Sequence, residues 1–135
     1  MRVLAVDYGE RRTGIAVSDE LGITAQGLET IEVAKEEEIP DRVASVVKET
    51  GAETIVVGLP LNMNGTESEK SGKVREFAAL LSEITAVPVV FWDERMTTMQ
   101  AQRVMREMNK KTYKNKPLLD KISATLILQE YLKTI

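Results

Sequence analysis

Residues 3–19 read VLAVDYGERRTGIAVSD, and this stretch predicts how the fold begins. Its first four residues form an unbroken apolar run, which is typical of a strand buried on both faces, and Asp7 follows that run directly. A second strand is expected over residues 14–18, joined to the first by a polar turn that contains Gly9. An acid at the end of a buried strand is either a turn residue or a functional group, and this stretch alone leaves both open.

The composition restricts the chemistry that this chain can perform. Its 135 residues include no cysteine and no histidine, which excludes thiol nucleophiles, Ser-His-Asp triads and Cys/His zinc sites. Any catalysis must use carboxylates, hydroxyls, lysine or arginine. The length predicts one domain over residues 1–135. The lack of cysteine, of a signal-peptide pattern and of a long apolar run predicts a cytoplasmic protein with no membrane contact.

Apolar periodicity and turn residues predict an α/β fold. We expect strands at residues 2–6, 14–18, 24–31, 54–57 and 87–92, and helices at 36–49, 66–84, 97–108 and 117–132. Capping boxes are expected at residues 66–69 and 97–100. Residues 109–116 are rich in lysine without an apolar period and predict a mobile loop. An antiparallel meander followed by two parallel strands predicts a mixed sheet with helices on both faces.

Several carboxylates are expected at one end of this sheet. Asp93 and Glu94 follow the last strand, at the same edge as Asp7, and only one of them is expected to face a site there because adjacent strand residues point opposite ways. Asp120 lies one helical turn before Ala124 on the apolar stripe of the last helix, so its carboxylate points toward the sheet. A buried carboxylate is costly unless it is paired, protonated or bound to a cation.

Each acid also has an ordinary structural explanation. Asp120 would complement the helix dipole or pair with Lys116 or Lys121, and an acid after a strand often caps a helix or pairs with a neighbour such as Arg95. Together, however, oxygen ligands of this kind suit a divalent metal, either Mg²⁺ or Mn²⁺. Two such ions roughly 3.5–4 Å apart activate a water and stabilise the leaving oxygen in phosphodiester cleavage. This is the chemistry best matched to the groups available.

Several separate motifs now resemble one known family. The chain is similar to the YqgF/RuvX family over essentially its whole length, through VDYG at 6–9, RTGIAVSD at 12–19, GLPLNMNG at 58–65, DERMTT at 93–98, and 116–120 with Ala124. The resemblance implies a ribonuclease H-like fold with a five-stranded sheet. It also implies a nuclease in 5′-end maturation of pre-16S ribosomal RNA, and the family has been proposed to resolve Holliday junctions. Its metal-binding acids map onto Asp7, the Asp93–Glu94 pair, of which we take Glu94 as the ligand, and Asp120.

The resemblance also suggests residues that would contact a nucleic acid. Asn62 and Asn64 would line the substrate groove, although an Asn-Gly pair is also ordinary turn chemistry. Arg95 would neutralise the scissile phosphate or, alternatively, bridge Asp93 or Asp120. Residues 103–121 hold seven Lys or Arg residues against two acids, and the expected backbone contacts are Lys110, Lys111, Lys114 and Lys116.

Glycine and aromatic residues complete the expected substrate contacts. Gly9 and Gly14 would leave room for a nucleic-acid backbone beside Asp7. Tyr113 would stack on bases, whereas core packing is the favoured interpretation for Trp92 because it ends a buried strand. The helix opened by Thr97 and Thr98 would point its backbone donors at an anion.

Three functions follow from different interpretations of these residues. The favoured one is a metal-dependent nuclease acting on structured RNA, or on branched DNA as a resolvase. Nucleotide binding of the sugar-kinase type is a second hypothesis, which the length of the chain disfavours because such proteins enclose the nucleotide between two domains. A non-catalytic RNA-binding or transcription-associated factor is the third. We expect a monomer or a weak dimer.

Overall fold

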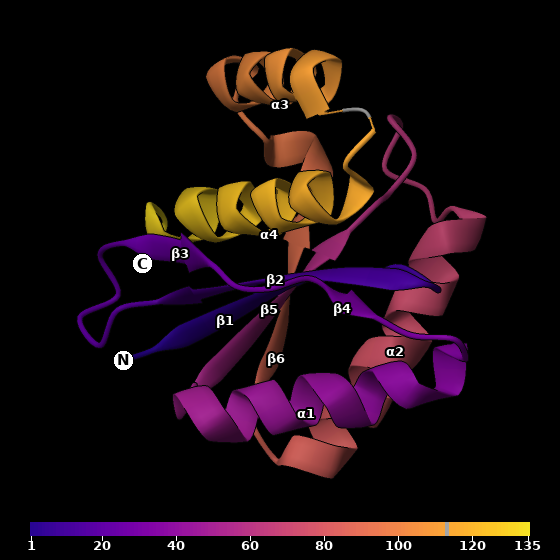
Figure 1. Cartoon of the computed structure of the whole chain (residues 1–135), viewed down its shortest axis with the longest axis vertical. Helices are drawn as coiled ribbons and strands as arrows, with labels where there is room; N and C mark the ends of the chain where they lie inside the picture. The colour runs from indigo at the N-terminus through magenta and orange to yellow at the C-terminus, as the bar shows by residue number, and fades with distance from the viewer. Residues whose placement is uncertain (113) are drawn as a thin grey trace.

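A mixed β-sheet forms the centre of the protein (Figure 1), whose computed structural model describes residues 1–112 and 114–135. Within those residues the sheet has six strands in the order β3-β2-β1-β5-β6, with β4 paired to β2 outside this path. The strands are β1 (Val3–Asp7), β2 (Arg12–Ser18), β3 (Ala25–Gly27), β4 (Ile31–Glu32), β5 (Thr54–Leu59) and β6 (Val89–Asp93). β1 runs antiparallel to β2 and parallel to β5, which is itself parallel to β6. The carboxyl ends of β1, β5 and β6 therefore meet at one edge.

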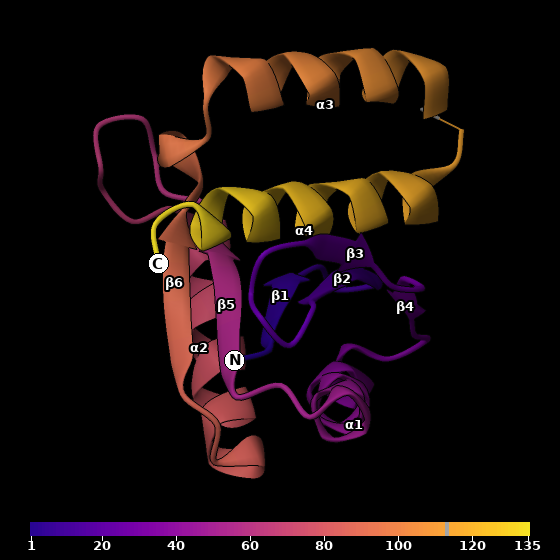
Figure 2. The same cartoon turned by 90° about the vertical axis from the view of Figure 1, so that its left-hand side faces the viewer.

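Helices cover both faces of this sheet, as the sequence predicts. The described helices are the short η1 (Glu36–Glu38) and η2 (Glu94–Met96), with α1 (Ile39–Thr50), α2 (Glu69–Thr85), α3 (Met99–Thr112) and α4 (Lys116–Leu132). Figure 2 shows α1 and α2 on one side, α4 on the other, and α3 as an outer layer that lies along α4. None of the described helices has the length and apolar character needed to cross a membrane.

The apolar run of β1 is divided between two cores. Leu4 and Val6 pack into the core that α1 and α2 cover, whereas Val3 and Ala5 pack into the core beneath α4. All four side chains are fully buried. Burying an aliphatic side chain of this size stabilises the fold by about 1.5–3 kcal/mol, so packing from both faces holds β1, and with it Asp7, in place.

The outer helix α3 is longer than the sequence predicts, and the expected mobile loop over residues 109–116 is wrong. The helix continues to Thr112, and α4 already begins at Lys116. Ala101 and Met105 face α4 at helical spacing, and Lys110 and Lys111 occupy the last turn, where cations complement the helix dipole. The lack of an apolar period in this segment reflects an exposed helix end, because Asn109, Lys110 and Lys111 all face solvent.

The predicted strand over 24–31 is likewise two short strands, β3 and β4, separated by residues 28–30. Both pair with β2, so β4 adds a sixth strand to the five expected from the family resemblance. Trp92, in contrast, is buried in the core as expected.

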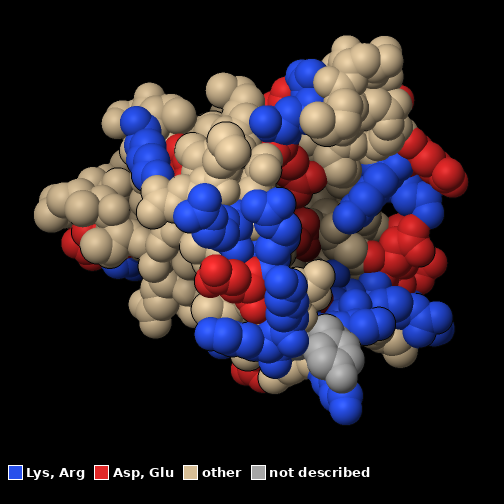
Figure 3. Space-filling model, turned by 90° about the horizontal axis from the view of Figure 1, so that it is seen from above, with Lys and Arg blue, Asp and Glu red and all other residues tan. Residues whose placement is uncertain are grey.

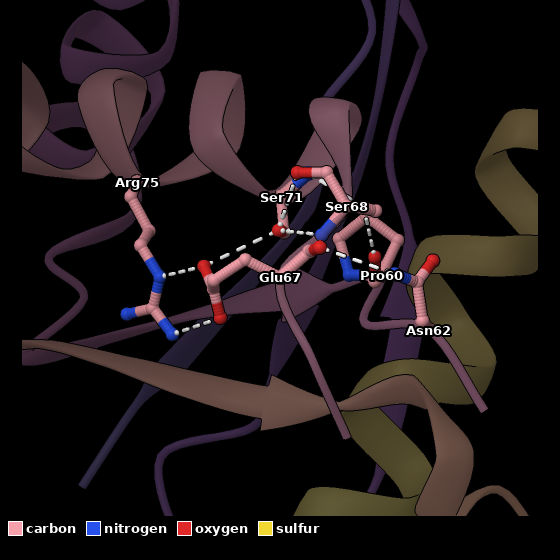
Figure 4. Close-up of polar contacts among 6 residues, drawn as sticks. All are labelled: Pro60, Asn62, Glu67, Ser68, Ser71 and Arg75. Carbon is pink, nitrogen blue, oxygen red and sulfur yellow. Dashed lines mark hydrogen bonds and ion pairs between the residues drawn. The ribbon is translucent and has the colours of Figure 1, made fainter. Parts of the chain in front are cut away.

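Two helix caps lie later in the chain than the expected capping boxes. Ser68, not Thr66, caps α2: its Oγ accepts a hydrogen bond from the Ser71 amide at 3.0 Å, and its own amide donates to Ser71 Oγ (Figure 4). Ser68 Oγ also donates to the carbonyl of Pro60 at 2.6 Å, which ties the start of α2 to the loop after β5. The Ser68 hydroxyl hydrogen-bonds two backbone groups, and it is therefore preferred as the cap over Thr66, which the Thr66–Glu69 capping-box pattern predicts.

The start of α3 is held by a residue from α4. Thr98 Oγ1 accepts from the Ala101 amide at 3.1 Å and donates to Glu130 Oε1 at 3.2 Å. Glu130 is buried, and its carboxylate also accepts from Lys133. A buried acid is thereby satisfied by a hydroxyl and a cation, and α3 is anchored directly after the segment that carries Glu94.

Candidate active site

Three acids from distant parts of the chain meet at the carboxyl edge of the sheet. Asp7 ends β1, and Glu94 follows β6 at the start of η2. A Cβ added to Gly58 of β5 would lie 3.1 Å from Glu94 Oε1, so the Glu94 carboxylate reaches back over the neighbouring strand. Asp120 comes from the first part of α4, which crosses β1 and β2. The three acids lie near the same end of the sheet, where the charges of Glu94 and Asp120 act on Asp7.

The environment of Asp7 disfavours its charge. Burial among protein atoms, together with the negative charges of Glu94 and Asp120, raises the pKa of Asp7 to about 7, against the opposing effect of the Lys70 ammonium. Burial likewise raises the pKa of Glu94, and Lys70 again acts in the opposite direction. A carboxyl such as Asp7, with a pKa of about 7, keeps its proton in part of the molecules at neutral pH unless a cation stabilises its ionised form.

The adjacent acids Asp93 and Glu94 have different partners. Asp93 caps η2 by accepting from the Arg95 amide at 2.9 Å, and it holds the Arg95 guanidinium with an Nη2–Oδ2 distance of 2.6 Å. This hydrogen bonding lowers the pKa of Asp93, in contrast to Glu94. Glu94 is therefore the member of the pair that shares an environment with Asp7. Of the two roles expected for Arg95, the structure shows the bridge to Asp93.

Asp120 pairs with a residue that the sequence did not suggest. Arg12 Nε, at the start of β2, donates to Asp120 Oδ2 at 2.9 Å, in place of the expected Lys116 or Lys121. The pair is separated by 108 positions in the chain, so no local pattern announces it. Half-burial of both side chains places this ion pair at the wall of the site and not on open surface.

A pocket of about 570 Å³ opens beside these acids. It is lined by Asp7, Tyr8, Gly9, Glu10, Arg11, Arg12, Glu69, Lys70, Lys73 and Asp120. The first turns of α2 contribute Lys70 and Lys73, and Lys73 forms an ion pair with Glu10 across the pocket. Sequence analysis missed both lysines because their spacing in the chain is that of any solvated helix start. The pocket thus combines two partly buried acids, Asp7 and Asp120, with several cations.

The two glycines have structural roles that differ from the expectation. A Cβ on Gly14 would overlap the carbonyl oxygen of Asp120, so Gly14 lets α4 lie against β2 and is not clearance for a nucleic acid. A Cβ on Gly9 would overlap the carbonyl of Arg12, which the tight turn between β1 and β2 brings close. Gly9 still lines the pocket, as expected of a substrate-contacting residue.

The asparagines of the loop after β5 are engaged within that loop. Asn62 Nδ2 donates to Thr66 Oγ1 at 3.0 Å and to the carbonyl of Glu67, and Asn64 Oδ1 accepts from Thr66. Gly65 adopts a φ of 87°, which favours glycine. Arg95 Nη1 contacts the carbonyl of Met63 in the same loop. Asn62 and Asn64 thus form the turn that was their alternative interpretation, in a loop that borders the Asp93–Arg95 segment.

The predicted basic residues gather at the far end of the α3–α4 hairpin. Lys110, Lys111, Lys114 and Lys116 are all exposed, and Lys116 lies one helical turn before Asp120. Figure 3 shows basic side chains spread over this side of the molecule, with acidic atoms recessed between them. Tyr113, the other expected contact, lies outside the described residues.

No three acids of residues 1–112 and 114–135 stand close enough together to ligate one metal ion as they are placed. Asp120, the third acid of the cluster, is paired with Arg12 instead. A shared ion would require at least that the Asp120 carboxylate leaves Arg12.

Comparison with known proteins identifies the family. The RuvX family model, described as Holliday junction resolvase, matches residues 1–134. This chain belongs to the RuvX family. The RuvX-family relatives include a protein of Clostridium novyi that is 47% identical over 135 residues, covering 100% of both chains. One from Acetivibrio thermocellus is 48% identical over 134 residues, covering 98% of this chain and 95% of the relative. Both carry the name "Putative pre-16S rRNA nuclease".

Solved structures confirm the ribonuclease H-like fold of this RuvX-family chain. Thermus thermophilus RuvC in complex with Holliday junction substrate superposes with a TM-score of 0.62 at 16% identity, covering 99% of this chain and 95% of that one. The fowlpox virus resolvase in complex with Holliday junction DNA superposes with a TM-score of 0.63 at 12% identity, covering 99% of this chain and 98% of that one. At this level of identity the likeness concerns the fold alone.

Proposed function

We propose that this RuvX-family protein is a divalent-metal-dependent nuclease that hydrolyses phosphodiester bonds in pre-16S ribosomal RNA. The observation that carries the proposal is the pair Asp7 and Glu94, whose pKa values are raised by burial and, for Asp7, by the neighbouring acids. A divalent cation would stabilise their ionised forms. The name shared by the full-length relatives supports RNA as the substrate.

The donor set fits Mg²⁺ or Mn²⁺. Asp7 and Glu94 offer carboxylate oxygens at the carboxyl ends of β1 and β6, the two strands on either side of β5, and Asp120 would offer a third after a side-chain rotation. Carboxylate oxygens are the hard ligands that these cations prefer. Asp7, Glu94 and Asp120 would hold the metal. Once bound, divalent ions activate a water and stabilise the leaving oxygen of a phosphodiester.

The chain itself would bind and orient the substrate. Lys70 and Lys73 at the pocket wall would attract phosphates, and the exposed lysines of the α3–α4 hairpin would contact the backbone without reading sequence. Asp93 would act indirectly, by holding Arg95 against the loop after β5. We propose a cytoplasmic location, in keeping with the proposed role in ribosomal RNA maturation. A monomeric or weakly dimeric state stays a prediction, which sedimentation would measure.

The test is cleavage of precursor ribosomal RNA in Mg²⁺ or Mn²⁺ by the wild type, Asp7→Asn and Asp120→Asn. We expect cleavage by the wild type alone, and loss of it in EDTA. Asp41→Asn, a matched change on the exposed side of α1, is expected to keep activity. Equal activity in all proteins would contradict the proposal.

Parallel assays separate the other functions. Metal-dependent cleavage of a branched DNA junction, with precursor RNA left intact, would favour the resolvase. RNA binding that weakens steeply with salt, without cleavage in any metal, would favour a non-catalytic RNA-binding factor. Saturable ATP binding in calorimetry would favour the nucleotide-binding hypothesis.

A further inference from the structure

The ion pair of Arg12 and Asp120 occupies the site proposed to bind the cation. Arg12 Nε lies 2.9 Å from Asp120 Oδ2, and both residues line the pocket that contains Asp7. The side chains are 34% and 25% exposed, so solvent and small ions reach the pair from the pocket. Arg12 therefore binds the same carboxylate that a metal would take.

The backbone of Asp120 is fixed even though its side chain is accessible. Gly14 lies so close to the Asp120 carbonyl that a Cβ there would overlap it, and Ala124, one turn later, is fully buried against the sheet. The helix has no room to shift at this point. The carboxylate changes partner only by rotating about its side-chain torsions, which is a small and rapid motion.

If Arg12 left Asp120, its guanidinium could bind a phosphate in the same pocket. Its guanidinium is a planar fork that matches the oxygens of a phosphate, and it stays charged at any relevant pH. Lys73, another cation of this pocket, is already paired with Glu10. Arg12 is held at the start of β2, beside Asp7, where the reacting phosphate would enter.

We propose that Arg12 exchanges partners: it binds Asp120 in the metal-free protein, and it binds a phosphate of the nucleic acid when Asp120 turns to the divalent cation. The inference rests on the proposed function, because it takes Asp120 as a metal ligand. Both ligands require the Arg12–Asp120 ion pair to break. The exchange therefore makes the cation strengthen the binding of the nucleic acid, and the nucleic acid strengthen the binding of the cation. Until both ligands arrive, Arg12 also neutralises the Asp120 carboxylate.

Two binding measurements on Arg12→Gln test this exchange. Calorimetric titration with Mn²⁺, without nucleic acid, is expected to show about two- to fivefold tighter binding, because a competitor for Asp120 is gone. Fluorescence anisotropy with a labelled RNA hairpin is expected to show nearly unchanged affinity in EDTA and about tenfold weaker affinity in Ca²⁺, which takes the same oxygen ligands. Arg42→Gln, the same change on exposed α1, is expected to match the wild type in both measurements.

A second variant keeps the test independent of folding. Arg12→Lys retains a cation for Asp120 but lacks the planar fork, so we expect near wild-type Mn²⁺ affinity with reduced RNA affinity in Ca²⁺. Weaker Mn²⁺ binding by Arg12→Gln, or an equal loss of RNA affinity in EDTA and in Ca²⁺, would overturn the exchange.

The result also separates this inference from the proposed function. If the wild type binds Mn²⁺ and cleaves RNA while Arg12→Gln behaves like Arg42→Gln, the exchange alone is refuted. If the wild type neither binds Mn²⁺ nor cleaves in any metal, the proposed function fails and the exchange fails with it.

Discussion

Gly14 of β2 lies directly beneath the carbonyl oxygen of Asp120, so close that even a methyl group would overlap it. Gly14 also pairs with Asp7 in the antiparallel register of β1 and β2. One glycine therefore sets the height of α4 above the sheet and places Asp120 over the strand position next to Asp7. Its requirement is steric, because any side chain would displace the helix.

Replacing Gly14 by alanine is expected to destabilise the protein by about 1–3 kcal/mol, the usual cost of overpacking a closed interface. Urea denaturation measures this directly. Gly72→Ala is the matched control: it lies in α2 with open space where a Cβ would be, so alanine is expected to stabilise by about 0.5–1 kcal/mol. Equal stability of Gly14→Ala and the wild type would refute the proposed contact.

Glu94 and Asp93 are expected to differ sharply in mutagenesis. Glu94→Gln removes a proposed metal ligand, and we expect cleavage to fall by about two orders of magnitude or more, with weaker Mn²⁺ binding. Asp93→Asn loosens Arg95 only, and we expect a loss of about tenfold or less with unchanged Mn²⁺ affinity. Single-turnover cleavage and calorimetry on the same preparations compare the two. The reverse ranking would assign the ligand to Asp93.

The raised pKa of Asp7 predicts a pH-dependent stability in the metal-free protein. The carboxyl has a pKa of about 7 in the folded chain against an ordinary 3.8, so the unfolded chain releases this proton first as pH rises. Stability is then lost between about pH 4 and pH 7, and it is lowest above that interval. Asp7→Asn removes the ionisation and is expected to stabilise the protein by about 1–3 kcal/mol at about pH 8, with little change at about pH 4.

Denaturation in EDTA across this pH range measures the effect of Asp7→Asn. Addition of Mg²⁺ at high pH is expected to stabilise the wild type and not the variant, since the ion replaces the proton on Asp7. If Asp7→Asn changed the free energy of unfolding by the same amount at high and at low pH, the Asp7 carboxyl would not be buried as described.

The outer face of α3 is expected to contribute affinity without specificity. Arg103, Arg106 and Lys110 are exposed on α3 and recur at helical spacing. Changing all three to glutamine is expected to weaken RNA binding at low salt and to lower the salt slope of log affinity by about 2–3. Anisotropy at several salt concentrations measures the slope, with single-turnover cleavage at saturation expected to stay near wild type. If the salt slope of log affinity did not change, α3 would not be part of the RNA-binding surface.

The sequence predicted the elements best where the pattern is set by burial. Val3 to Val6 are apolar without interruption because β1 is covered on both faces, and the order of strands and helices follows from such runs. It failed at residues 109–112, because an exposed helix end carries no apolar period, and at the two caps, because several hydroxyls compete within a few positions.

The sequence pointed to the acids of the candidate site but not to the lysine and arginine residues beside them. Asp7, Glu94 and Asp120 are marked by their place at strand ends and on a core-facing helix stripe, which are local signals. Lys70 and Arg12 carry no such signal, since solvated helix starts and turns commonly hold cations. Their relation to the acids depends on where α2 and β2 pass in space.

The sequence by itself determined the fold class, the family and the set of carboxylates, because these depend on periodicity and on motifs within short segments. Only the tertiary structure decided that Asp120 faces Arg12 and that Gly14 serves helix packing. The reason is that α4 crosses β2 more than a hundred positions away in the chain. Which side chains meet there is set by how the two cores close on the sheet, and no local pattern encodes that geometry.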